Sequence, residues 1–131
     1  MRLTGYTDHA LRLLMYLGRQ PGRRVTVQEI AQAHAISEHH LRKVANRLAR
    51  AGLVASVRGR SGGLRLAQPP SCISVGAVVR LAEASFTIVE CFNAARSTCP
   101  MSAGCALKEV LQQATQAYLG HLDRLTLADL I

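Results

Sequence analysis

The apolar residues of the first fifty positions recur at helical spacing in three segments, and this pattern predicts three helices. The first spans residues 7–17, and Gly18, followed by Pro21 and Gly22, ends it. Its apolar face is expected to contain Leu11, Leu14, Met15 and Gly18. The first helix is therefore predicted to be amphipathic and to rest on a core formed by the segments that follow.

The second and third helices are predicted from their N-terminal caps. Thr26 and Glu29 have the spacing of a capping box, which starts a helix over 27–34. Ser37 is the expected cap of a helix over 38–51, which ends at Gly52. The inner faces of the two helices are expected to be Val27, Ile30 and Ala31, and Leu41, Val44 and Leu48. With only a tight turn at residues 35–36 between them, the two helices match the helix-turn-helix plan.

Alternating apolar residues then predict a β-hairpin, with strands over 53–57 and 64–67 and a glycine-rich tip between them. Pro69 and Pro70 close this unit. Three helices followed by a two-stranded hairpin are the plan of a winged helix. The predicted fold class is thus mainly α with a small β-hairpin wing.

The second half of the chain is predicted to be an arm. Ser74 caps a short helix over 75–84, an extended segment covers 86–92, a loop covers 93–104, and a long helix covers 106–122, before Thr126 and Asp129 cap a final turn. The apolar stripe of the long helix consists of Leu107, Val110, Leu111, Ala114, Ala117, Tyr118, Leu122 and, beyond it, Leu125. This stripe either folds back as core or packs against a second copy. We favour the dimer because winged helices commonly pair to span two half-sites.

Charge separates the two halves. Residues 1–70 contain twelve Lys and Arg and three acids, a net charge of +9, whereas residues 71–131 contain four and five, a net charge of −1. Fourteen of the sixteen cations are Arg, whose planar guanidinium suits phosphates and guanine edges. The chain has no Trp and few other aromatics, which argues against a single-strand binder that stacks bases. We therefore predict a winged helix-turn-helix DNA-binding domain over 1–70, and a metal-binding loop and dimerisation helix over 71–131.

The predicted DNA contacts lie on the third helix and on the wing. A solvated amphipathic face is the alternative, but no acid after Glu38 balances the cations of this helix, and Arg58 and Arg60 add charge at the flexible wing tip. The residues expected in the major groove are Ser37, His39, His40, Arg42 and Lys43. Arg58 and Arg60 are expected at phosphates or in a narrow minor groove. Arg47 and Arg50 are expected to touch the DNA backbone or nothing.

Three of the four cysteines form a candidate metal site. The apolar run at 13–17 is too short for a signal peptide or a membrane span, so we expect a cytoplasmic protein with reduced thiols and no membrane partner. Cys91, Cys99 and Cys105 lie within fifteen residues, separated by seven and five residues. Soft thiolates suit an iron–sulfur cluster, zinc or Cu(I), and buried structural cysteines are the alternative. Cys72, nineteen residues upstream, is expected to be a core or surface residue.

Several stretches together resemble one family, the winged-helix iron–sulfur regulators, and within it the nitric-oxide-sensing repressors. The matching stretches are 1–8 (MRLTGYTD), 36–44 (ISEHHLRKV), 58–66 (RGRSGGLRL), 89–92 (VECF), the three cysteines and 126–130 (TLADL). In cluster-biogenesis regulators of the same family, a histidine ligand follows the last cysteine by three residues, whereas this chain has Lys108 there. Seven residues separate the first two cysteines here, where five is common in the family.

The resemblance implies a DNA-binding transcriptional repressor, a homodimer on an inverted-repeat operator. It implies one iron–sulfur cluster per subunit on Cys91, Cys99 and Cys105, a [4Fe–4S] cluster in preference to [2Fe–2S]. It also implies that Asp8 of the partner subunit supplies the fourth ligand, that nitric oxide is the signal, and that nitric-oxide detoxification genes are regulated. The alternative role for Asp8 is to help Thr7 cap the first helix.

Two other kinds of function compete with this one. A zinc- or thiol-based redox repressor would use the same cysteines, and a general nucleoid protein would share the charge but would not need them. An enzyme is not expected, because no paired acids, Ser-His-Asp arrangement, P-loop or HExxH motif occurs.

Overall fold

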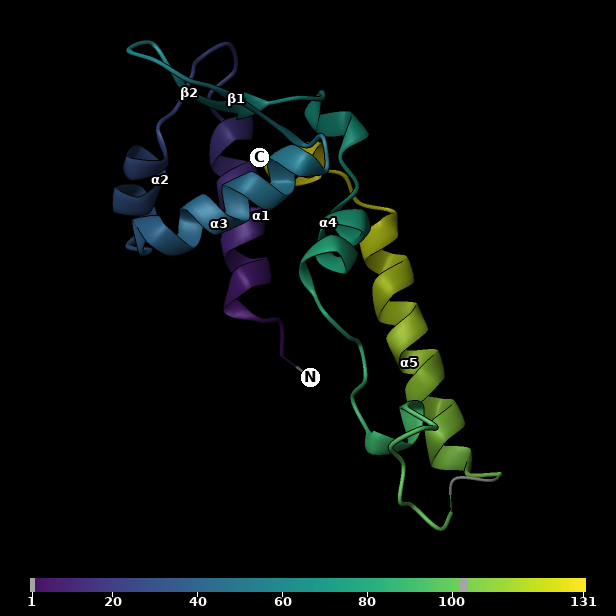
Figure 1. The fold of residues 1–131 in the computed structure, drawn as a ribbon. Coiled ribbons are helices and arrows are strands. Elements are labelled where there is room, and N and C mark those ends of the chain that lie inside the picture. The colour runs from purple at the N-terminus through teal and green to yellow at the C-terminus, as the bar shows by residue number, and fades with distance from the viewer. Residues whose placement is uncertain (1, 102–103) are drawn as a thin grey trace.

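The computed structural model of the chain describes residues 2–101 and 104–131 and shows a winged helix with a helical arm (Figure 1). Met1 and residues 102–103 of the predicted loop lie outside the described residues. The elements in chain order are α1 (Gly5–Gly18), α2 (Val27–His34), α3 (Glu38–Arg50), β1 (Val54–Val57), β2 (Gly63–Leu66), the 3₁₀ turn η1 (Pro70–Cys72), α4 (Val75–Ala82), the 3₁₀ turn η2 (Glu90–Phe92), α5 (Ala106–Asp123) and the 3₁₀ turn η3 (Leu127–Leu130). The predicted fold class is confirmed.

Helix α1 begins earlier than predicted, and its buried face is centred differently. Thr4 caps it by accepting a hydrogen bond from the backbone N–H of Thr7 at 3.4 Å, so the helix starts at Gly5. Its buried residues are Thr7, Ala10, Leu13, Leu14 and Leu17. The prediction was right about Leu14, whereas Leu11 and Met15 are only half-buried and pack at the edge of the core.

The helix-turn-helix unit follows the prediction except in two caps. Thr26 accepts from the backbone N–H of Glu29 at 3.1 Å, but the Glu29 carboxylate binds Arg23 and Tyr16 instead of completing the capping box. Ala35 takes the left-handed conformation (φ 52°) in the turn to α3. Ser37 occupies the N-cap position of α3 without making a side-chain capping hydrogen bond.

The wing is an antiparallel pair of strands in which Val54 faces Leu66 and Val57 faces Gly63. Leu64 also exchanges backbone hydrogen bonds with Val25, at 2.9 and 2.7 Å, which ties the base of the wing to the segment before α2. One hydrophobic core joins buried residues of α1, α2, α3 and the wing to Ile73, Val78 and Leu127 from the second half. The division at residue 70 therefore stays a prediction about function, since packing continues across it.

The second half differs from the prediction at two points. Helix α4 ends at Ala82 instead of residue 84, and the segment predicted to be extended contains the 3₁₀ turn η2. The chain end returns to the winged domain, because Leu127 donates a backbone hydrogen bond to Ile73 at 2.8 Å. Thr126 and Asp129 form the predicted capping box there.

Helix α5 divides its predicted apolar stripe between two faces. Leu111, Tyr118 and Leu122 are half-buried on the side where Thr115 is buried against the rest of the chain. Leu107 and Val110 are 64% and 60% exposed, and Ala114 and Ala117 continue this second face, which is also exposed. One edge of the stripe thus packs within the chain and the other is uncovered in it, and packing of the uncovered edge against a second copy stays a prediction. No helix among the described residues is long and apolar enough to cross a membrane.

Candidate nucleic-acid interface and metal-binding segment

Helix α3 presents its polar face to solvent because its apolar face is locked in the core. Leu41, Val44 and Leu48 are almost completely buried. The predicted major-groove residues on or beside this helix, Ser37, His39, His40, Arg42 and Lys43, are all exposed. The rings of His39 and His40 lie 6.0 Å apart. The structure thus leaves all five predicted residues accessible on the outer side of one rigid element.

One assumption about α3 was wrong. Glu38 and Arg42 form an i,i+4 ion pair, with the Arg42 Nε donating to Glu38 Oε1 at 3.1 Å. The sequence reasoning considered only acids after Glu38 and so missed this partner. Because the pair is exposed, it is worth little, and Arg42 can exchange it for a base or a phosphate.

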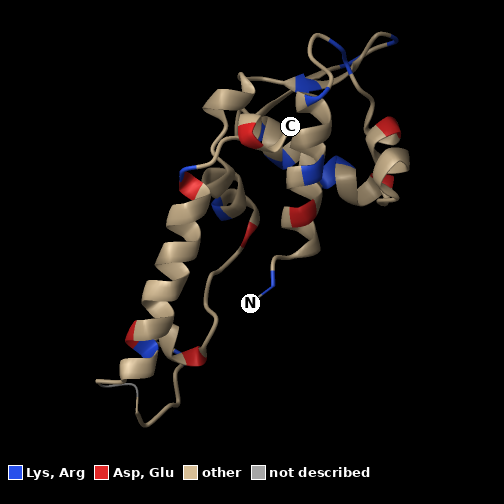
Figure 2. Cartoon of the chain, turned by 180° about the vertical axis from the view of Figure 1, so that it is seen from behind, with Lys and Arg blue, Asp and Glu red and all other residues tan. Residues whose placement is uncertain are grey.

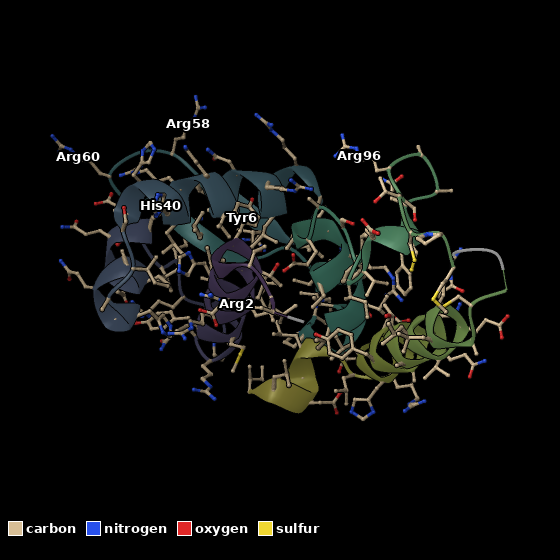
Figure 3. The ribbon with its side chains drawn as sticks, turned by 90° about the horizontal axis from the view of Figure 1, so that it is seen from below. Arg2, Tyr6, His40, Arg58, Arg60 and Arg96 are labelled. Carbon is tan, nitrogen blue, oxygen red and sulfur yellow. The ribbon has the colours of Figure 1, made fainter. Side chains whose placement is uncertain are left out.

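The wing tip carries Arg58 and Arg60, whose side chains extend into solvent at the edge of the molecule (Figure 3). Gly59 supports the turn with a positive φ of 105°. Arg24, which the sequence reasoning did not select, donates to the carbonyl of Ser61 at 3.0 Å and braces the tip. A groove of about 360 Å³ separates the wing from α2 and α3, and both Arg42 and Arg60 line it.

The charge distribution in space follows the distribution along the chain. Lys and Arg gather on the winged domain, whereas the arm carries both signs (Figure 2). Arg47, which is expected to touch the DNA backbone or nothing, donates from Nη2 to the carbonyl of Leu81 at 2.6 Å, and its guanidinium lies 5.9 Å from the centre of the Tyr6 ring. Arg47 and Arg50 are both exposed, and their relation to DNA stays a prediction.

The three candidate cysteine ligands lie on the segment that joins η2 to α5. Cys91 is in η2, Cys99 is in the following loop and Cys105 is the N-cap residue of α5. All three are half-buried free thiols, whereas Cys72 is exposed in η1. Figure 1 places this segment at the far end of α5 from the winged domain.

The long spacing between Cys91 and Cys99 is taken up by a turn. The carbonyl of Asn93 accepts from the backbone N–H groups of Arg96 and Ser97, both at 3.0 Å. The Asn93 side chain also accepts from the N–H of Ala95 at 3.1 Å. The seven intervening residues therefore do not stretch the two cysteines apart as an extended chain would.

Asp8 does not lie with the cysteines of its own chain. It stands in the first turn of α1 and forms an ion pair with Arg12, Oδ2 to Nε at 2.9 Å. The residue that caps this helix is Thr4 and not Thr7. Asp8 lies in the first turn of the helix, which is where the alternative interpretation expected an acid. Within residues 2–101 and 104–131, no three His, Cys, Asp or Glu side chains come together as a metal-ion site. The donor chemistry fits an iron–sulfur cluster, since the thiols are half-buried and reduced, but the ligand set stays a prediction.

Two residues connect the arm to the winged domain: Glu83, which the sequence analysis did not select, and Arg47, for which it did not predict this contact. The Glu83 carboxylate accepts from Thr7 Oγ1 at 2.5 Å and from the backbone N–H of Thr4 at 2.8 Å. Arg47 makes the contact to Leu81 described above. Both contacts join residues more than thirty positions apart, so periodicity and local motifs contain no signal for them.

Comparisons with known proteins agree with this architecture. The Rrf2 family, described as "Iron-dependent Transcriptional regulator", matches residues 3–131. The HTH-type transcriptional regulator NsrR of Bacillus subtilis (strain 168) is 47% identical over 132 residues, which cover 100% of this chain and 90% of the relative. NsrR of Shouchella clausii (strain KSM-K16) is 44% identical, with coverage of 100% and 89%.

Solved structures show the same fold. That of CymR (YrzC), the global cysteine regulator of B. subtilis, is similar with a TM-score of 0.82 at 28% identity, covering 99% of this chain and 95% of that one. IscR from T. potens is similar with a TM-score of 0.79 at 27% identity, covering 99% and 85%.

The winged helix, its exposed basic recognition helix and its basic wing define a DNA-binding transcriptional regulator. The match over 129 of its residues, from 3 to 131, shows the family: the chain belongs to the Rrf2 family of transcriptional regulators.

Proposed function

We propose that the protein is a homodimeric transcriptional repressor that responds to nitric oxide through an iron–sulfur cluster held by Cys91, Cys99 and Cys105. The observation that carries this proposal is the placement of three half-buried free thiols on the one segment between η2 and the start of α5. The names of the relatives support the regulator, and the word "Iron-dependent" in the family description supports iron.

A cluster on three thiolates needs a fourth ligand, and we assign it to Asp8 of the partner subunit. In this chain the Asp8 side chain is 49% exposed and its ion pair with Arg12 is a surface pair, so the carboxylate is available to a second copy. When bound, the cluster supplies iron that reacts with nitric oxide. A carboxylate is a harder ligand than the three thiolates. The iron that Asp8 would hold is therefore expected to be the one that exchanges its ligand.

The exposed face of α5 supports the dimer. Leu107 and Val110 are large apolar residues more than half exposed on one helix, and Ala114 and Ala117 extend the same face. A second copy packed there would cover this apolar surface and set two recognition helices at a fixed separation. Two copies would then read an inverted repeat with Ser37, His39, His40, Arg42 and Lys43 in the major groove, and with Arg58 and Arg60 on the backbone or in the minor groove.

The position of the three thiols indicates how DNA binding would be controlled. If Cys91, Cys99 and Cys105 are held at a common centre, the two ends of their segment, η2 and the first turn of α5, are tied together. Release of the thiolates frees that segment and, through α4 and α5, changes the separation of the two winged domains. A coupling free energy of about 1–3 kcal/mol per site is ordinary for such regulation. The expected site of action is the cytoplasm, and the expected targets are nitric-oxide detoxification genes.

The test is anaerobic purification followed by assays of iron, sulfide and zinc, with operator binding measured before and after stoichiometric nitric oxide. Iron and sulfide in the wild type, their loss in Cys99→Ser, and their retention in the control Cys72→Ser are expected. Zinc, or metal-free protein that forms a disulfide, would favour the redox alternative. The proposal is wrong if the protein keeps its operator affinity after nitric oxide has bleached its absorbance.

Binding measured against competitor DNA distinguishes the hypothesis of a specific repressor from that of a nucleoid protein. At one salt concentration, a repressor binds its promoter well above random duplex, whereas a nucleoid protein binds both equally.

A further inference from the structure

Arg47 stands on the recognition helix but binds the arm. Its Nη2 donates to the carbonyl oxygen of Leu81 at 2.6 Å, and its guanidinium lies 5.9 Å from the centre of the Tyr6 ring. One side chain of α3 thus contacts both α4 and α1. The Tyr6 hydroxyl also donates to the carbonyl of Lys43 at 3.4 Å, in the half of α3 predicted to read DNA.

The acceptor, the carbonyl oxygen of Leu81, lies at the C-terminal end of α4, where a cation stabilises a helix most. Leu81 is the penultimate residue of α4, so its carbonyl is one of those left without a partner inside the helix. Such carbonyls form the negative end of the helix dipole, which a guanidinium stabilises. The contact therefore holds the C-terminal end of α4 against the recognition helix.

The same end of α4 is also held to the start of α1. Glu83, the C-cap residue of α4, accepts hydrogen bonds from Thr4 and Thr7. The chain that leads to Cys91 leaves α4 directly after this junction. A displacement of the cysteine segment is therefore transmitted along the chain to residues 81–83, where Arg47 binds Leu81.

We propose that Arg47 is the positioning residue through which the cysteine segment sets the operator affinity of the recognition helix. The inference rests on the proposed function and adds the route of control to it. The hydrogen bond to Leu81 is short, and it breaks when its atoms separate by about 1 Å more, beyond the limit for a hydrogen bond. A small shift of α4 is therefore enough to break this contact between α4 and α3.

The first test needs no cofactor. Hydrogen exchange is measured on the metal-free full-length protein as wild type, Arg47→Met and the control Arg50→Met, which removes the same charge from the same helix. Arg47→Met is expected to speed exchange at the end of α4, residues 81–83, by about threefold or more, as for the removal of one hydrogen bond. Arg50→Met is expected to leave that exchange unchanged, and unchanged exchange in α2, which Arg47 does not contact, shows that the fold is intact. Equal exchange in both variants would overturn the proposal.

The second test compares operator affinity of the purified holoprotein before and after nitric oxide. In Arg47→Met the affinity before treatment is expected to fall toward the treated value, so that the ratio of the two affinities drops at least about threefold, well within an ordinary coupling. A fall by the same factor in both states would show a direct DNA contact and overturn the proposal. A wild-type ratio of one contradicts the proposed function instead, and the exchange result then decides the role of Arg47 alone.

Discussion

Arg80 and Asp123 form a bidentate ion pair that joins α4 to the end of α5, with Nη2 of Arg80 donating to Oδ2 of Asp123 at 2.8 Å. The hydrogen bonds from Arg80 hold the pKa of the Asp123 carboxyl below its ordinary value. Gly76 lies beside this pair, on α4, where the helix comes against the backbone of Asp123. The pair and the glycine together hold the end of α5 close against α4.

Gly76→Ala is expected to destabilise the protein because a Cβ at this position would stand 2.8 Å from the backbone nitrogen of Asp123. Backbone cannot move aside as a flexible side chain can, so the cost is that of overpacking, about 1–3 kcal/mol. Urea unfolding measures it. Gly120→Ala is the matched control, since nothing lies within 4 Å of its Cβ position. There alanine is expected to stabilise α5 by about 0.5–1 kcal/mol. Equal effects at the two sites would refute the close approach.

Glu83 is expected to make stability depend on pH in the acid range. Partial burial raises the pKa of its carboxyl, but the hydrogen bonds from Thr7 and Thr4 outweigh this and lower the pKa below its ordinary value of 4.5. A carboxyl with a lower pKa in the folded state stabilises the fold above that ordinary value, and the contribution is lost as the pH falls below it. Wild type is therefore expected to be more stable than Glu83→Gln at neutral pH, and the gap is expected to close in acid.

Urea unfolding of both proteins across this range checks the prediction for Glu83. Other acids with lowered pKa, such as Asp123 and Asp129, titrate in both proteins, so the difference between the two isolates Glu83. A gap that stays constant from neutral to acid pH would show that Glu83 contributes through its shape and not its charge.

Val110→Glu is expected to separate the proposed dimer into monomers, because it places a charge within the exposed apolar face of α5. Gln116→Glu is the control, since it adds the same charge to an exposed position on another side of the helix. Analytical ultracentrifugation measures the mass. The helix is not the dimer interface if Val110→Glu and Gln116→Glu sediment alike.

Replacing Arg58 and Arg60 by alanine is expected to weaken binding to operator and random duplex alike, since both residues are predicted to contact the backbone or a narrow minor groove. The slope of log K against log salt becomes less steep by about 0.9 for each phosphate that the protein no longer neutralises. Arg124→Ala, an exposed cation at the end of α5, is the control for net charge. Affinity titrations at several salt concentrations give the slopes, and an unchanged slope in the wing variant would place the wing away from DNA.

Features that depend on neighbours along the chain were predictable from sequence. Thr26, Ser74 and Thr126 cap helical segments by hydrogen bonds to residues three positions away, so their positions follow from local spacing. The wing follows from strand alternation around a glycine-rich tip, and the basic recognition face follows from the same periodicity that buries Leu41. The grouping of three cysteines in one segment is likewise visible in the sequence.

Features that depend on packing between elements were not predictable in this way. Which face of α1 is buried depends on the side from which α3 and α4 pack against it, so Ala10 is buried and Met15 only half-buried. The apolar stripe of α5 divides into two faces because only one edge of it packs against the rest of the chain. Arg47 and Arg50 are both exposed, and no pattern in the sequence indicates that Arg47 is the one that binds Leu81.

The sequence by itself therefore determined the winged helix, the basic surface and the three thiols, because caps, periodicity and charge act over a few residues. Only the tertiary structure decided which cations face solvent and which hold the fold together, and which edge of α5 stays uncovered. The physical reason is that these contacts join residues more than thirty positions apart, and their geometry exists only after the helices have packed.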